Sequence, residues 1–234
     1  MDLQQIIERN LAEVRARMTE AARRSGRRPD EVRLVAVTKF VSETAIRAVV
    51  AAGCRVLGES RPQHLWDRAA ALSDLSVEWH LIGPLQRNKV RRTLPLVGLL
   101  HSADSEDLVL AIDRIAGELG RVAPLLLEVN CSGDEAKHGF EPEAVAAALD
   151  RLAPLRHVQI RGFMGMAALD GGSDVARRNF SLLRKLRDRL RSDCPPAISL
   201  DELSMGMSGD FEVAIEEGAT LVRVGSALFE GLAP

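Results

Sequence analysis

Leu34-Val35-Ala36-Val37-Thr38-Lys39 is a short apolar run that ends on a lysine, and a helix-like segment at 42–52 follows it. If the run forms a strand, alternation places Val35, Val37 and Lys39 on one face, toward the interior of a sheet or barrel. Four of the 31 basic residues are lysines, so arginine supplies nearly all of the positive charge. A lysine forms a Schiff base and an arginine does not, which makes Lys39 a candidate reactive amine. A solvated lysine at a strand end is the alternative interpretation.

The same unit repeats along the chain, because short apolar runs alternate with amphipathic, helix-like segments. The runs cover residues 33–39, 54–57, 77–83, 97–103, 124–130, 158–165, 198–204 and 221–226. The helix-like segments include 42–52, 105–119, 141–152, 174–190 and 209–217, and an earlier apolar stripe predicts a first helix that ends near Ser25-Gly26. Eight strands with intervening helices predict a (β/α)8 TIM barrel with an extra N-terminal helix, formed by one domain over residues 1–234. An open doubly wound sheet, which needs fewer strands, is the alternative.

Composition argues against several classes of function. A net charge of −2 gives no basic surface for nucleic acid, and no run of 18 apolar residues predicts a membrane-spanning helix. The three cysteines lie far apart without a CxxC motif, and the five histidines are dispersed, so neither a disulfide framework nor a metal site is expected. Because arginines interrupt the N-terminal segment where a signal peptide would be apolar, we expect a cytoplasmic protein, and we expect it to be a monomer.

Two glycine-containing loops follow the seventh and eighth runs, where barrels commonly bind phosphate. The first, Ser204-Met205-Gly206-Met207-Ser208-Gly209-Asp210, opens the last helix, and Ser208 is predicted to cap that helix beside free N–H groups. The second, Arg223-Val224-Gly225-Ser226-Ala227, is a turn of small residues with exposed amides. A plain helix cap and a plain turn are the alternatives. A reactive lysine and two phosphate-binding loops on one barrel together indicate pyridoxal phosphate.

Motifs in matching order from about residue 34 to 229 closely resemble the YggS/PROSC family of pyridoxal phosphate homeostasis proteins. They are Val35-Ala36-Val37-Thr38-Lys39, Gly58-Glu59, Trp79-His80-Leu81-Ile82-Gly83-Pro84-Leu85-Gln86-Arg87-Asn88-Lys89, Glu128-Val129-Asn130, Gly162-Phe163-Met164, Leu203-Ser204-Met205-Gly206-Met207-Ser208 and Arg223-Val224-Gly225-Ser226. That family is similar to the barrel domain of bacterial alanine racemase without its second domain. The chain departs from the family pattern at Ser60, Gly165 and Glu230.

The resemblance implies a role for five residues. Lys39 matches the lysine that carries pyridoxal phosphate covalently, as a Schiff base (aldimine). Ser208, Gly225 and Ser226 match the positions that hold the phosphate, and Arg223 matches the arginine that faces the pyridine nitrogen. No catalytic residue and no metal ligand is implied.

Arg223 has a consequence that follows from its chemistry. A carboxylate beside the pyridine nitrogen keeps the ring protonated, whereas an arginine donates a hydrogen bond and favours the unprotonated nitrogen. The ring then withdraws fewer electrons, and carbanion chemistry is less stabilised. Racemisation also needs an acid–base group on the second face of the substrate, which in alanine racemase is a tyrosine from the second domain of a partner chain. This chain contains no tyrosine, so a racemase of that design is excluded.

Two functions remain open from the sequence. The first is a carrier that holds pyridoxal phosphate as a lysine aldimine and serves vitamin B6 homeostasis, with apo forms of pyridoxal phosphate enzymes as possible recipients. The second is a small pyridoxal phosphate-dependent amino-acid enzyme, such as a racemase or decarboxylase with an unrecognised second base. Arg223 and the missing tyrosine favour the carrier.

Other motifs carry less weight. His80 is interpreted either as a residue lining the pocket or as a hydrogen-bonded core histidine. The basic segment 86–92 either steers an anion or is a solvated helix face, and we favour the solvated face. Arg184, Arg187, Arg189 and Arg191 are expected on the outer face of one helix, and 171–173 is expected to form a loop.

Overall fold

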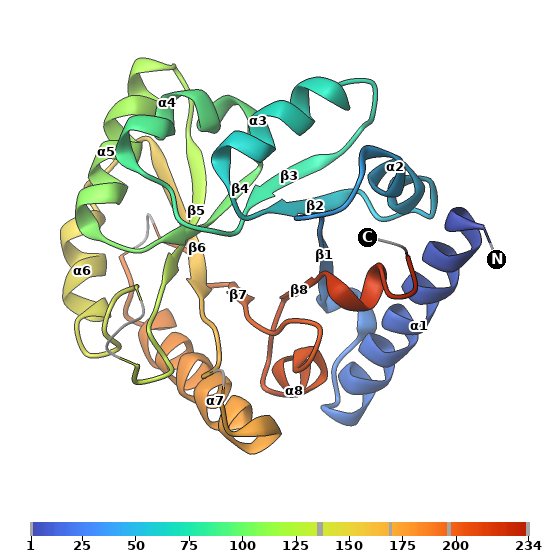
Figure 1. Ribbon diagram of the computed structural model, residues 1–234. Helices are drawn as coiled ribbons and strands as arrows, with labels where there is room; N and C mark the ends of the chain where they lie inside the picture. Colours follow the sequence, from blue (N-terminus) through green and yellow to red (C-terminus); the bar gives the residue numbers. More distant parts are fainter. Residues whose placement is uncertain (1, 135–137, 169, 196–197, 233–234) are drawn as a thin grey trace.

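The valine- and leucine-rich runs form eight parallel strands that close into a barrel (Figure 1). The computed structural model describes residues 2–134, 138–168, 170–195 and 198–232. Each strand pairs with the next one along the chain, and β8 pairs with β1. The strands are β1 (Arg33–Val37), β2 (Val56–Glu59), β3 (Glu78–Leu81), β4 (Leu99–Ala103), β5 (Ala123–Glu128), β6 (Val158–Met164), β7 (Glu202–Ser204) and β8 (Leu221–Val224). The barrel expected from the sequence is confirmed.

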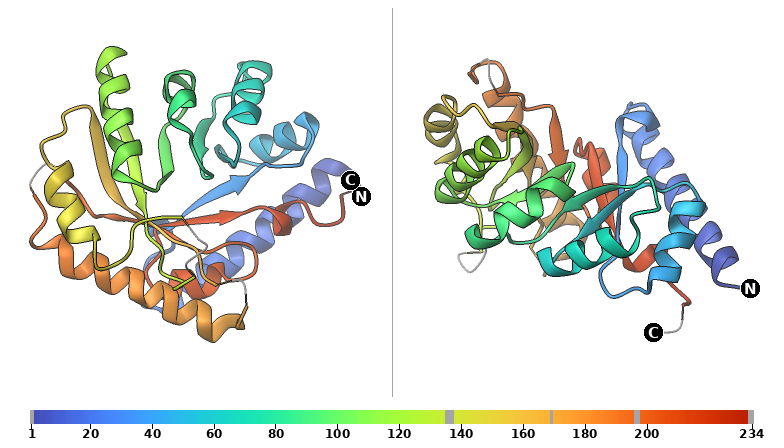
Figure 2. Two further views of the ribbon diagram at one scale, coloured as in Figure 1. Left: turned by 60° about the vertical axis from the view of Figure 1, so that its left-hand side comes forward. Right: turned by 90° about the horizontal axis from the view of Figure 1, so that it is seen from above.

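Helices cover the outside of the barrel, as the amphipathic segments predict (Figures 1 and 2). They are α1 (Leu3–Arg24), α2 (Glu43–Ala51), α3 (Pro62–Ala71), α4 (Val90–Thr93), α5 (Glu106–Glu118), α6 (Val145–Leu152), α7 (Gly172–Arg191) and α8 (Phe211–Glu216), with short 3-10 turns η1 (Pro29–Glu31), η2 (Arg87–Lys89), η3 (Leu94–Leu96) and η4 (Ser226–Leu228). The extra N-terminal helix is confirmed. Asp2 and Gln5 form its capping box, and its apolar stripe packs against α2, α8 and η4.

Strand alternation separates two sets of side chains. Val35, Leu99, Leu126, Met164 and Leu221 form a small apolar cluster inside the barrel. The larger core lies between strands and helices, and it includes Val222 and Val224 from the outer face of β8. The interior also holds buried polar side chains, among them His80, His101, Glu128, Ser204 and Arg223.

A close contact between β6 and β7 depends on one glycine. Gly162 has a φ of 150°, and a Cβ built on it would lie 1.9 Å from the carbonyl oxygen of Glu202. A side chain would therefore push the two strands apart.

Within the described residues, no helix is both long and apolar enough to cross a membrane.

Candidate functional site

Lys39 lies in the turn that connects β1 to α2, at the carboxyl end of the barrel strands. The strand ends at Val37, two residues earlier than the apolar run suggested, and the Lys39 side chain is exposed. Phe40, the next residue, has a φ of 67° and is 78% exposed. The Nζ atom of Lys39 lies 5.9 Å from the centroid of the Phe40 ring. The lysine is thus accessible at the mouth of the barrel, beside a residue with an unusual backbone conformation.

Arg68 of α3 holds this turn from both sides of Lys39. Its guanidinium donates to the carbonyl oxygen of Thr38 and, at 2.8 Å, to that of Val41. It also forms an ion pair with the fully buried Glu59, whose Oε1 accepts from the Thr38 hydroxyl. The other carboxylate oxygen of Glu59 is buried without a hydrogen-bond partner. Neither Arg68 nor the role of Glu59 was predicted, although the Gly58-Glu59 motif at the end of a strand was a signal for the carboxylate.

The loops after β7 and β8 meet at the Ser208 hydroxyl. Its Oγ accepts from the backbone N–H of Gly225 at 3.1 Å and of Ala227 at 3.4 Å. The prediction that Ser208 caps the last helix is wrong, because α8 begins later and Asp210 occupies the N-cap position. The Asp210 carboxylate instead accepts from the backbone N–H of Met207 at 2.6 Å. The two amides that converge on one oxygen are the donor arrangement by which turns bind anions.

Two glycines of these loops lie in close contact with their neighbours. Gly206 has a φ of 92°, and a Cβ there would lie 2.5 Å from Ala214 Cβ. A Cβ on Gly225 would lie 3.2 Å from both the Cβ and the carbonyl oxygen of Val37. The turn after β8 therefore packs directly against the end of β1, two residues before Lys39. Ser226, which opens η4, is exposed beside this turn.

Arg223 points into the barrel from β8, on the same face as Leu221, because alternate residues of a strand lie on one face. It is 4% exposed and donates to the carbonyl oxygen and hydroxyl of Ser204, at 2.8 and 2.6 Å, and to the carbonyl oxygen of Gly165 at 3.1 Å. Burial lowers the pKa of Arg223 to about 10, against the opposing charges of Glu128 and Asp210. The guanidinium therefore stays charged at neutral pH and is held by the ends of β6 and β7.

Glu128 is a second buried ionisable group in the neighbourhood of Arg223. Burial raises the pKa of this carboxyl to about 7, the charge of Asp104 adds to the rise, and Arg223 opposes it. A carboxyl with this pKa exchanges a proton near neutral pH. The Glu128-Val129-Asn130 motif is part of the family resemblance, but neither the position of Glu128 near Arg223 nor its titration was predicted from the sequence.

His80 proves to be a hydrogen-bonded core histidine, which is one of its two interpretations. It is fully buried, and its ring nitrogens contact Glu78 and His101.

The segment 86–92 forms η2 and α4, where Arg91 pairs with Glu118 and Arg92 stacks on Trp66 at 4.2 Å. These contacts agree with a solvated face.

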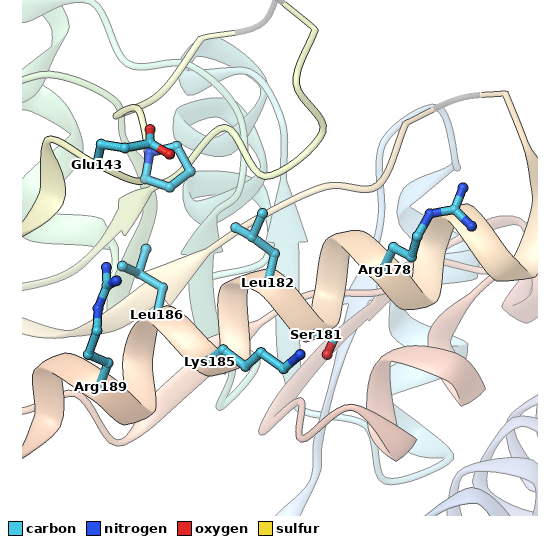
Figure 3. Close-up of a pocket in the computed structure, with 8 residues that line it drawn as sticks. Glu143, Arg178, Ser181, Leu182, Lys185, Leu186 and Arg189 are labelled. Atoms are coloured by element: carbon cyan, nitrogen blue, oxygen red, sulfur yellow. The ribbon is translucent and has the colours of Figure 1, made fainter.

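Figure 3 shows a surface pocket on α7, which includes none of the predicted site residues. It is lined by Pro142, Glu143, Arg178, Ser181, Leu182, Lys185, Leu186 and Arg189. Arginines of α7 form ion pairs, as Arg184 does with Glu217 and Arg191 with Asp201. Residues 172 and 173, part of the predicted loop at 171–173, already belong to α7.

Comparison with known proteins agrees with this geometry. The family model of the alanine racemase N-terminal domain matches residues 9–233. A pyridoxal phosphate homeostasis protein of Aquifex aeolicus is 40% identical over 219 residues, which cover 94% of this chain and 95% of that protein. One from Deinococcus radiodurans is 41% identical, with 92% and 97% covered. This chain belongs to the family of pyridoxal phosphate homeostasis proteins. The resemblance seen in its motifs is confirmed.

Solved structures show the same likeness. The chain matches PipY of Synechococcus elongatus with pyridoxal phosphate bound, at a TM-score of 0.84 and 39% identity over 95% of this chain and 99% of that one. An alanine racemase of Clostridium difficile shares the fold alone, with a TM-score of 0.71 at 13% identity. The match covers 98% of this chain and 56% of the racemase. The family barrel is therefore the counterpart of part of the racemase chain.

Proposed function

We propose that this protein binds pyridoxal phosphate at the carboxyl ends of its strands, covalently through the Lys39 amine, and serves the cell's supply of the cofactor without turnover of its own. One observation carries the proposal. The amides of Gly225 and Ala227 converge on a single oxygen, and their loop packs against the strand end that leads to Lys39. Hydrogen-bond donors suited to a phosphate and a primary amine thus lie at the same mouth of the barrel. The names of similar proteins support the same ligand.

Each part of the ligand has a matching group in the chain. The amides of Gly225 and Ala227 and the hydroxyls of Ser208 and Ser226 are the proposed phosphate ligands. They supply hydrogen bonds without a cationic side chain, as turn amides do at many anion sites. Arg223 is the proposed neighbour of the pyridine nitrogen, and Lys39 the proposed point of attachment. When bound, the cofactor supplies an electron-withdrawing ring joined to an amine.

The residues around this site favour a carrier. Arg223 is held by three hydrogen bonds to β6 and β7 ends and stays charged, so it keeps the proposed pyridine nitrogen unprotonated. No tyrosine is present to act as an acid on a second face. The exposed turn around Lys39 would leave the proposed attachment point accessible to an incoming amine. These features together support retention and exchange, and they disfavour carbanion chemistry.

One observation favours the alternative, a small amino-acid enzyme such as a racemase or decarboxylase. Glu128 is a buried carboxyl with a pKa of about 7 near Arg223, and a group of this kind is suited to acid–base catalysis. The two functions differ in turnover. With a panel of free amino acids, a carrier exchanges its ligand once, whereas an enzyme turns substrate over at roughly 1–1000 per second.

The transfer assay tests the carrier directly. The loaded protein is mixed with the apo form of a pyridoxal phosphate enzyme while a scavenger removes free cofactor. We expect the apo enzyme to gain activity, and the Lys39→Ala variant to give no gain. Lys185→Ala, on the exposed face of α7, is the matched lysine control. Sustained amino-acid turnover by the loaded protein itself would overturn the carrier function in favour of the alternative.

A further inference from the structure

A chain of hydrogen bonds runs through the barrel interior to Arg223, and it begins at the amino end of β3. Glu78 lies at the start of β3, and its Oε1 atom is 3.0 Å from His80 Nε2. His80 Nδ1 lies 2.9 Å from His101 Nε2, and His101 Nδ1 lies 2.8 Å from Ser204 Oγ. Ser204 Oγ accepts from Arg223 at 2.6 Å. His80, His101 and Ser204 are fully buried, whereas the Glu78 side chain is 45% exposed.

For a neutral His80, proton counting fixes the direction of every bond in this chain. The Glu78 carboxylate only accepts, so His80 Nε2 carries a proton. If His80 is neutral, its Nδ1 must accept from His101 Nε2–H, and His101 Nδ1 must then accept from the Ser204 hydroxyl. The Ser204 oxygen keeps its lone pairs for Arg223. Each donor and acceptor is used once, which is the arrangement that a buried polar network needs.

A second proton on His80 reverses this order. Its Nδ1–H would then donate to His101 Nε2, and a neutral His101 would carry its proton on Nδ1. That proton would be donated to Ser204 Oγ, which would receive hydrogen bonds from both His101 and Arg223. The two states differ in the tautomer of His101 and in the direction of the Ser204 hydroxyl.

We propose that His101, set by His80, is a positioning residue for Arg223: its tautomer decides whether the Ser204 oxygen accepts from Arg223 alone or is shared between Arg223 and His101. The inference rests on the proposed function only in its consequence, namely that Arg223 faces the pyridine nitrogen. The relay itself involves only side chains of this chain, and its test does not require bound cofactor.

The surroundings of the two rings agree with a change of tautomer at His101 and not a change of charge. Burial holds the pKa of His101 well below its ordinary value, and the charges of His80, Arg223 and Arg33 act in the same direction. A buried ring flanked by arginines stays neutral, so it passes a proton on instead of retaining one.

Charged groups from three further strands lie near the entrance of the chain at Glu78. The hydrogen bond from His80 lowers the pKa of the Glu78 carboxyl, against its partial burial, and Arg33 of β1 and Arg161 of β6 add to the lowering. Arg33 is also paired with Glu202 of β7 at 3.0 Å. Arg223 of β8 stands at the opposite end. Glu78 is therefore the ionised group at the entrance of the chain.

Nitrogen-15 spectra of the imidazole rings test the relay in the full-length protein without cofactor. Across a pH series, we expect the pyrrole-type and pyridine-type signals of His101 to exchange positions when the His80 ring carries its second proton. His101 should show no imidazolium signal in this series. An unchanged His101 tautomer across the series, or direct protonation of His101, would overturn the proposal.

The variant His80→Gln keeps hydrogen-bonding groups at this position but cannot ionise. In this variant the tautomer of His101 is expected to lose its pH dependence. In the loaded protein, the pH-dependent shift of the cofactor absorbance should be lost as well, while the cofactor remains bound. A pH-dependent tautomer with a pH-independent absorbance would contradict the link to Arg223. Failure of the wild-type protein to bind the cofactor would contradict the proposed function, and the tautomer result would stand separately.

Discussion

Arg223 is the residue on which the carrier function depends, because its charge sets the electron demand of the proposed ligand. Replacement by glutamate should favour a protonated pyridine nitrogen and speed exchange of the α-proton of a bound amino acid with solvent. The rate of deuterium exchange at that carbon measures the effect. Arg223→Gln, which has no charge, is the control. Equal exchange in wild type and in the glutamate variant, with cofactor bound in both, would count strongly against this role.

Ser226 is a residue whose proposed contact is with the phosphate alone. Its replacement by alanine should remove one hydrogen bond to a charged group, which costs ~1.5–3 kcal/mol, or roughly a 10- to 150-fold weaker affinity. Equilibrium dialysis against pyridoxal phosphate measures this change. Ser181→Ala on α7 should leave the affinity unaltered. Equal affinities for Ser226→Ala and wild type would place the phosphate elsewhere.

Glu128 makes a pH-dependent contribution to stability. Because its pKa is about 7 in the folded protein and lower when unfolded, the folded state binds more protons between these values. Stability is therefore lost as pH rises from about 5 to 8, by on the order of 2 kcal/mol for a shift of this size. Urea unfolding of Glu128→Gln and wild type at both pH values measures this difference. We expect the variant to gain relative stability at pH 8, and an equal difference at both pH values would contradict the shift.

Single residues also show where sequence reasoning stops. Lys39, Ser208, Arg223, Gly225 and Ser226 were chosen from motifs, and their roles as ligands remain predictions. Arg68 and His101 were missed because their partners are distant in the sequence. Arg68 contacts Thr38, 30 positions away, and His101 contacts Ser204, 103 positions away. No local pattern reports such contacts. The direction of Arg223 was predictable because alternation along one short strand decides it.

At the scale of elements, Arg68 and its ion-pair partner Glu59 fix the conformation of the β1–α2 turn. Arg68→Lys keeps the charge but loses the planar guanidinium that reaches two carbonyl oxygens. We expect a folded protein with a faster-exchanging turn and weaker cofactor retention. Arg68→Ala leaves Glu59 buried and unpaired, and it should cost about 3–5 kcal/mol. Amide hydrogen exchange of residues 38–41 and urea unfolding check the two variants. If Arg68→Lys shows the amide exchange and the cofactor retention of the wild type, the turn does not depend on the guanidinium.

The elements were mostly predictable, and their ends were not. Apolar runs located all eight strands, but the run at 33–39 overestimated β1, because the chain turns once Thr38 has bonded to β2. The cap of α8 was misassigned to Ser208. Its hydroxyl is taken by amides from the loop after β8, a tertiary contact that competes with capping.

For the whole molecule, closure of the barrel explains why one mouth collects these groups. Eight parallel strands bring the ends of β1, β7 and β8 together, although most of the chain separates β1 from the other two. The same closure gives Arg223 a connection through the interior to Glu78 on the opposite face. In the proposed carrier, the ligand would lie at one end of the barrel, and the chain of buried hydrogen bonds would connect Arg223 to the other end.

The attachment point is the central claim, and one measurement tests it most directly. The protein is loaded with pyridoxal phosphate, reduced with borohydride and digested, and the labelled peptide is sequenced by mass spectrometry. We predict a single adduct on Lys39 and none in Lys39→Ala, with Lys185→Ala labelled like wild type. An adduct on any other lysine, or none after loading and reduction, would contradict the account.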